Sequence, residues 1–224
     1  MRKQKVWHSI EEIFTTLNNC GCNYIVMRNF EGFMTGQVLL DGHDDIDLLC
    51  DNPQKVCKIL NTKRRFLFPT VNSYYIQYNN STVQIDIRFV GDGYYDMEWQ
   101  KDMLKHKTLV ASNIYVMDHQ NYFYSLIYHA TIQKHYLSEE YLKKLVEMSY
   151  RLGMNCNSKE ELMKTLFCVM KKRKYFVTMP CDPGIIFNIS NIDKSLIRNN
   201  YFWFIKRKVL NALKRIKWIG DKYV

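Results

Sequence analysis

Long hydrophobic runs are missing from this sequence of 224 residues. It contains no stretch of about 20 apolar residues, which a membrane-spanning helix would need. Internal repeats and low-complexity tracts are absent too, which excludes repeat and compositionally biased architectures. What remains, 47% hydrophobic and 24% charged residues, is typical of a folded globular protein.

Cysteine patterns that bind zinc are also missing. The seven cysteines contain no CxxC pair, and no His or Cys follows Cys20 and Cys22 at a spacing that would complete a zinc site. The N-terminal segment leads into a charged helix instead of a long apolar run. We therefore expect free thiols in a reduced, cytoplasmic protein.

Acidic residues are fewer than basic ones, and the formal net charge is +10. Residues 201–224 hold seven basic residues against one acidic residue, and their apolar residues recur at spacings of three or four. Such a basic amphipathic helix, at 200–224, suits peripheral contact with the inner face of an anionic membrane. A surface helix with a solvated basic face explains the pattern equally well. No RNA-binding motif occurs, so nucleic acid is not an expected partner.

The periodic segments predict an α+β fold, in which a small mixed β-sheet flanked by helices is followed by an all-helical C-terminal region. Helices are expected at 8–19, 52–61, 96–105, 122–134, 138–152 and 158–172, and strands at 24–27, 45–50, 73–78, 82–90 and 113–117. Ser9 and Glu12 form a candidate capping box, and Asn79-Asn80 is a hairpin signal. We expect a core domain at 1–117, a helical domain at 118–199 and a tail helix at 200–224.

Three carboxylates lie on two of the predicted strands. In Gly42-His43-Asp44-Asp45-Ile46-Asp47-Leu48-Leu49, Asp45 and Asp47 alternate with apolar residues, so both leave the strand on one face. Asp86 alternates in the same way within Val83-Gln84-Ile85-Asp86-Ile87-Arg88-Phe89. Two Asp at this spacing have Cβ atoms about 6 to 7 Å apart, and their like charges require a counter-ion. Mg²⁺ is the simplest one, with Mn²⁺ as an alternative.

Carboxylates in this arrangement suit nucleotidyl or phosphoryl transfer, in which two metal ions about 3.5 to 4 Å apart clamp the attacking and leaving oxygens. We therefore assign Asp45, Asp47 and Asp86 as metal ligands and catalytic residues, and Asp86 also takes the proton of an acceptor hydroxyl. An alternative stays open, in which Asp47 pairs with Arg28 or Arg88 and Asp86 lies on a solvated strand face.

The stretch His43-Asp44-Asp45-Ile46-Asp47-Leu48 resembles the double-aspartate motif of the polymerase β-type nucleotidyltransferase superfamily. It looks especially like the motif of aminoglycoside nucleotidyltransferases and of bacterial nucleotidyltransferases from surface-polysaccharide loci. The order of predicted elements over residues 8–135 is similar as well. The resemblance implies that Asp45 and Asp47 are metal ligands and that Asp86 is the third carboxylate.

One departure from this pattern concerns phosphate binding. Members of the superfamily usually place Gly-Ser or Gly-Gly after the strand that precedes the acids, where the pair holds the triphosphate. Here that position reads Met27-Arg28-Asn29-Phe30. We name Arg28, as a bidentate clamp, and Asn29 as candidate phosphate-binding residues. Arg88 either neutralises a phosphate or pairs with Asp86. Lys134 is the candidate phosphate-binding residue of the helical region, because the helical region of the superfamily commonly offers basic groups to phosphates.

The sequence thus predicts an enzyme, a Mg²⁺-dependent nucleotidyltransferase that transfers NMP from an NTP to a small hydroxyl or phosphate acceptor. A sugar or polyol derivative in surface-polysaccharide synthesis is the expected acceptor. A second hypothesis is a phospho-alcohol transferase that uses a nucleotide-linked donor on a glycan at the membrane. A protein-modifying, toxin-type nucleotidyltransferase and a non-catalytic module that binds an anionic surface are further alternatives.

Overall fold

A computed structural model describes residues 5–33, 45–65, 72–134, 136–178 and 188–197, with the single residues 180, 182, 185, 209 and 212. The chain divides into two compact units. The first comprises Met1–Asp92 and Gln100–Asp118, and the second comprises Gly93–Trp99 and His119–Val224. Strands and helices together confirm the predicted α+β class.

The first unit contains a mixed sheet of eight strands among the described residues. They are β1 (Val6–Trp7), β2 (Tyr24–Val26), β3 (Asp45–Cys50), β4 (Lys63–Arg64), β5 (Ser73–Tyr78), β6 (Ser81–Phe89), β7 (Thr108–Val110) and β8 (Ile114–Val116). Their order is β1-β5-β6-β3-β2-β8-β7, and β4 pairs with β5 off this path. At the centre, β3 runs parallel to β6 and antiparallel to β2, while β5 and β6 form an antiparallel hairpin.

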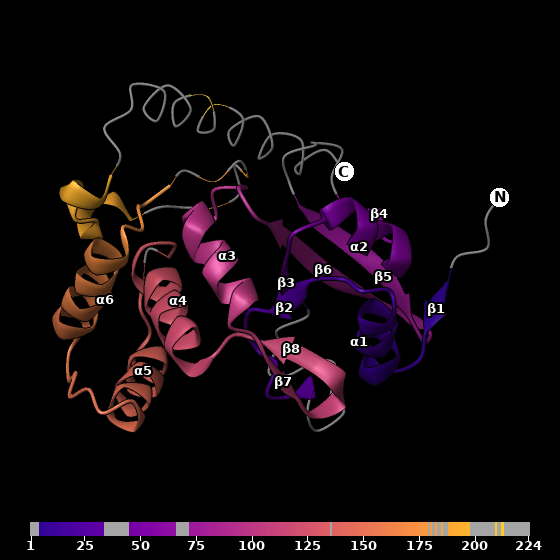
Figure 1. Ribbon diagram of the computed structural model, residues 1–224, viewed down its shortest axis with the longest axis horizontal. Coiled ribbons are helices and arrows are strands. Elements are labelled where there is room, and N and C mark those ends of the chain that lie inside the picture. The colour runs from indigo at the N-terminus through magenta and orange to yellow at the C-terminus, as the bar shows by residue number, and fades with distance from the viewer. Residues whose placement is uncertain are drawn as a thin grey trace. The chain divides into compact units, whose positions relative to one another are not determined.

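The two faces of this sheet differ in chemistry. Helices α1 (Ile10–Asn19) and α2 (Pro53–Leu60) lie side by side against one face, which we call the helix face (Figure 1). Ile46 and Leu48 of β3 and Ile85 of β6 are fully buried there. The alternate residues of the same strands, which include the acids, point to the opposite side, which we call the carboxylate face.

Local signals in the first unit act largely as predicted. The Ser9 hydroxyl accepts the backbone N–H of Glu12 (3.0 Å) at the start of α1. The Glu12 carboxylate accepts the N–H of His8 (2.9 Å), one residue before the expected partner. Asn52 caps α2 through the N–H of Lys55 (3.0 Å). Asn79 takes a left-handed backbone (φ +49°) in the β5–β6 hairpin, which Asn tolerates better than most residues.

The second unit confirms the predicted helical region. It contains α4 (His119–Thr131), α5 (Glu139–Arg151), α6 (Lys159–Arg173) and the short 3₁₀ turns η3 (Ile189–Asn191) and η4 (Lys194–Leu196). Its core is rich in aromatic rings. Trp99 stacks on Tyr175, with ring centroids 5.5 Å apart, and donates its indole N–H to the side-chain oxygen of Asn121 (2.9 Å). Trp99 lies on α3 (Met97–Lys105), the helix in which the chain passes from one unit to the other.

Some segments differ from the prediction or lie beyond the described residues. The sequence did not indicate β1, β4, β7 or the 3₁₀ turn η2 (Ala111–Asn113). The predicted tail helix at 200–224 lies outside the described residues, apart from Val209 and Ala212. Where the structure describes the chain, its cysteines are free thiols and none of its helices combines the length and hydropathy needed to cross a bilayer.

Candidate functional site

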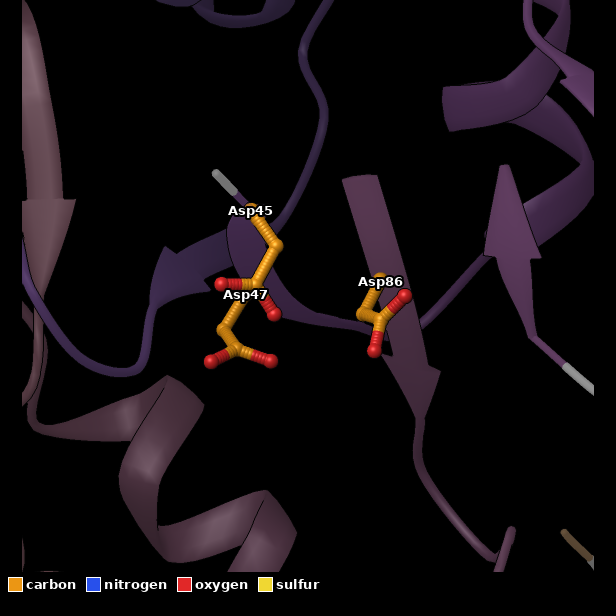
Figure 2. Close-up of side chains that lie close together, drawn as sticks. All are labelled: Asp45, Asp47 and Asp86. Carbon is orange, nitrogen blue, oxygen red and sulfur yellow. The ribbon is translucent and has the colours of Figure 1, made fainter. Parts of the chain in front are cut away.

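Asp45, Asp47 and Asp86 meet on the carboxylate face. Asp47 lies directly opposite Asp86 in the parallel β3–β6 pairing, and Asp45 leaves β3 on the same side. One oxygen from each carboxylate lies within 4.8 Å of the others. Figure 2 shows the three side chains extending from two neighbouring strands. The alternation of acidic and apolar residues therefore brings all three acids to one place.

Arg28 is the counter-ion of Asp47. Its Nε and Nη2 atoms both donate to Asp47 Oδ2, at 3.1 and 2.6 Å. The two side chains are largely buried, with 11% of Arg28 and 5% of Asp47 exposed. This pairing is the alternative that the sequence left open for Asp47. It places a guanidinium at the edge of the acidic group, two residues after the end of β2.

Asp86 has two polar neighbours on its own strand. Gln84 donates its amide N–H to Asp86 Oδ1 (3.2 Å), and Arg88 Nη2 lies 3.8 Å from Asp86 Oδ2. Burial and then the negative charge of Asp47 raise the pKa of Asp86 above its usual range, while the charge of Arg88 opposes this shift. The carboxyl group of Asp86 therefore holds a proton more readily than an exposed aspartate does.

This group of side chains fits a hard divalent cation. Three carboxylates supply only oxygen donors, which Mg²⁺ and Mn²⁺ prefer. Asp47 is buried, while Asp45 and Asp86 are partly exposed. With all groups ionised, the three carboxylates outweigh the guanidinium groups of Arg28 and Arg88 by one negative charge. The residues present can therefore hold a cation, and the guanidinium groups of Arg28 and Arg88 lie beside two of the carboxylates that would bind it.

The other two candidate phosphate-binding residues are Asn29 and Lys134. Asn29 follows Arg28 in a left-handed conformation (φ +57°) and is partly exposed. Lys134 belongs to the second unit, where its ammonium group lies 5.6 Å from the ring centroid of Tyr141. The structure thus groups Arg28 and Arg88 with the acids, and it describes Lys134 separately.

Sequence reasoning missed three residues on β5 and just after β4. Ser73 lies opposite Asp86 in the β5–β6 pairing and is buried, and its hydroxyl is among the groups that hold down the pKa of Asp86. Arg65 donates its guanidinium to the side-chain oxygen of Gln84. Tyr75 lies opposite Gln84 on β5. The pairing of distant strands brings these residues together, and only the predicted β5–β6 hairpin could have indicated part of it.

No family model matches the chain, and no curated sequence matches it. Solved structures that match include a solution structure of the antibiotic-resistance factor ANT(2'')-Ia, with a TM-score of 0.41 and 11% identity over 74% of this chain and 90% of that chain. A crystal structure of ANT(2'')-Ia in complex with adenylyl-2''-tobramycin gives a TM-score of 0.42 and 10% identity over 74% and 96%.

A third match is an antigenic nucleotidyltransferase-like protein from Paracoccidioides brasiliensis, with a TM-score of 0.40 and 14% identity over 75% of this chain and 91% of that chain. At this degree of similarity the function of the present chain is argued from its own side chains.

Proposed function

We propose that this chain is a divalent-metal-dependent nucleotidyltransferase. It transfers NMP from a nucleoside triphosphate to a hydroxyl or phosphate group of a small acceptor, such as a sugar or polyol derivative of surface-polysaccharide synthesis. The observation that carries the proposal is the convergence of Asp45, Asp47 and Asp86, whose carboxylate oxygens approach within 4.8 Å across two adjacent strands. The chemistry of such a carboxylate group is that of metal-assisted phosphoryl transfer.

The three acids have distinct roles in this proposal. Asp45, Asp47 and Asp86 would hold Mg²⁺ or Mn²⁺, which, when bound, neutralises phosphate oxygens and lowers the barrier to an in-line displacement. Asp86 accepts the proton of the acceptor hydroxyl while the oxygen of that hydroxyl forms a bond to the α-phosphorus. The bond between the α-phosphorus and the bridging oxygen breaks, and pyrophosphate leaves with the electron pair.

Phosphate recognition falls to the basic residues next to the acids. Arg88 lies two residues from Asp86 on the same strand face, within reach of a phosphate held at the carboxylates. Arg28 offers a planar guanidinium for two parallel hydrogen bonds, once it exchanges Asp47 for a phosphate oxygen. Asn29 is proposed to assist Arg28, and Lys134 is proposed to contribute from the helical region.

A second candidate function is transfer of a phospho-alcohol from a nucleotide-linked donor to a glycan. The observation that favours it is Arg28, which stands where Gly-Ser would hold a triphosphate and which already pairs with Asp47. The two functions give products of different mass, because only nucleotidyl transfer adds a nucleoside to the acceptor. With either function we also propose a cytoplasmic location and contact of residues 200–224 with a membrane. Sedimentation with anionic vesicles tests the membrane contact.

Calorimetric titration tests the proposed function. Wild-type protein and the double variant Asp45→Asn/Asp47→Asn are titrated with each of the four NTPs and with CDP-linked alcohols, with and without Mg²⁺. We expect Mg²⁺-dependent binding of an NTP that the double variant loses. Asp51→Asn is the matched control, because Asp51 is an exposed acid directly after β3.

Each other outcome of this titration has a defined meaning. Binding of CDP-linked alcohols alone would favour the second candidate function. Absence of Mg²⁺-dependent binding for every compound would contradict both functions, and so would equal binding by the double variant.

A further inference from the structure

A row of side chains continues from the acids toward β4 on the carboxylate face. Gln84 lies opposite Tyr75 of β5, and Tyr75 lies opposite Lys63 of β4. Arg65, two residues after Lys63, donates its backbone N–H to the carbonyl oxygen of Ser73 (3.0 Å) and so extends the same pairing. Because alternate residues of a strand share a face, Lys63, Arg65 and Tyr75 lie on the face of the acids.

These three residues form what we call the basic–aromatic patch. Lys63 and Arg65 are exposed and Tyr75 is partly exposed. The guanidinium carbon of Arg65 lies 5.8 Å from the ring centroid of Tyr75, a distance at which a cation and an aromatic ring attract each other. The patch therefore joins two positive charges to the exposed edge of an aromatic ring.

The patch is connected by hydrogen bonds to Asp86, the residue proposed to receive the hydroxyl proton. The Arg65 guanidinium donates to the side-chain oxygen of Gln84, whose amide donates to Asp86 Oδ1 (3.2 Å). A guanidinium has five N–H donors in a planar fork that suits phosphate, and an ammonium group adds a mobile point charge. An anion bound by Arg65 would thus lie one side chain away from Asp86.

We propose that the basic–aromatic patch binds the acceptor, and that the acceptor is a sugar or polyol that carries a phosphomonoester. Its phosphate lies at Lys63 and Arg65, its carbon skeleton lies along Tyr75, and its reacting hydroxyl lies at Asp86. This inference rests on the proposed function, since it uses Asp86 as the residue that receives the hydroxyl proton.

The sheet sets the size of this acceptor, and the charge of the patch sets its class. Strands β6 and β4 are two strand spacings apart, or about 9 to 10 Å, which is the span of a phosphorylated monosaccharide. A cationic acceptor would meet like charges at Lys63 and Arg65, and a neutral one would gain nothing from them. The patch therefore selects for an anionic acceptor.

The test uses the full chain with Mg²⁺ and the NTP that binds in the titration described above. Glucose 1-phosphate and glycerol 3-phosphate are titrated calorimetrically against their neutral counterparts, glucose and glycerol, and against cationic glucosamine. We expect the two phosphates to bind at least about tenfold more tightly, as one charged hydrogen bond would provide. Arg65→Gln is expected to remove about tenfold of this affinity, and Lys63→Gln somewhat less.

Arg64→Gln is the matched control. Arg64 pairs with Tyr74 on the other side of the strand, where its guanidinium carbon lies 5.8 Å from that ring centroid. The inference is overturned if phosphates bind no better than the neutral compounds, or if the Arg64 and Arg65 variants lose affinity equally. Inorganic phosphate that binds as tightly as the sugar phosphates would also overturn it. Metal-dependent NTP binding in the same samples reports separately on the proposed function.

Discussion

The helix face and the carboxylate face are built from the same strands, yet the first buries apolar side chains and the second carries charged ones. Ile46 and Ile85 are buried between the sheet and the helices, and their neighbours Asp45, Asp47 and Asp86 carry charge on the other side. The strand pleat separates the two sets of residues by a single step along the chain. Stability and chemistry can therefore be changed independently by substitutions one residue apart.

The largest difference between the faces should appear in turnover. In the proposed function Asp45→Asn removes a metal-binding carboxylate, so metal-dependent pyrophosphate release should fall by about 10³-fold or more. The melting temperature should stay close to that of the wild type, because Asp45 is partly exposed. Ile46→Val, one residue away, should leave turnover within about twofold and cost about 1 kcal/mol of stability. Similar losses of turnover in both variants would contradict this separation.

Leu48→Ala should show the reverse pattern on the helix face. The side chain is fully buried, so its truncation should lower the free energy of unfolding by about 2 to 5 kcal/mol. Chemical denaturation measures this loss. The folded fraction should still bind Mg²⁺ and NTP with wild-type affinity at low temperature, and a parallel loss of affinity would show that the two faces are coupled.

Arg28→Gln tests the counter-ion on the carboxylate face. It leaves the carboxylate of Asp47 buried without its guanidinium, which should cost about 3 kcal/mol in the presence of EDTA. Mg²⁺ should restore part of this loss, because it replaces the missing positive charge. The increase in melting temperature on adding Mg²⁺ should therefore be larger in the variant than in the wild type, and equal increases would contradict binding of the metal at Asp47.

The smallest expected effect concerns pH. Burial and the charge of Asp47 raise the pKa of Asp86 above its value of 3.8 in an unfolded chain. The folded state therefore binds the proton more tightly, and the stability that this provides below pH 3.8 is lost as pH rises through the folded-state pKa. Asp86→Asn cannot ionise, so its melting temperature in EDTA should fall less than that of the wild type from pH 4 to pH 7. Parallel curves would show that Asp86 is not perturbed.

Much of the first unit could be predicted because its signals are local. The β3 strand, the β5–β6 hairpin, the cap at Ser9 and the start of α2 at Pro53 depend on residues within a few positions of one another. Alternation within β3 and β6 was also enough to place the three acids on a common face. Short-range periodicity therefore indicated the acidic half of the site.

The sequence named Arg28 and Arg88, but it could not predict Arg65 or the contacts of these basic residues, because those depend on pairing between distant strands. β4 has two residues, both charged, and shows no alternation of apolar and polar side chains. Its pairing with Tyr74 and Tyr75 is what brings Arg65 next to Gln84. Likewise, the sequence allowed either Arg28 or Arg88 to pair with Asp47. Arg28 forms the pair because β2, which precedes it, lies beside β3.

The edge of β5 has a consequence for how copies of this protein behave toward one another. β1 pairs with one end of β5 at Gln77 and Tyr78, and β4 pairs with the other end at Tyr74 and Tyr75. A bare strand edge invites another chain to add to the sheet, and short strands with charged side chains prevent this. Replacement of Lys63 and Arg64 by apolar residues should therefore promote aggregation at this edge.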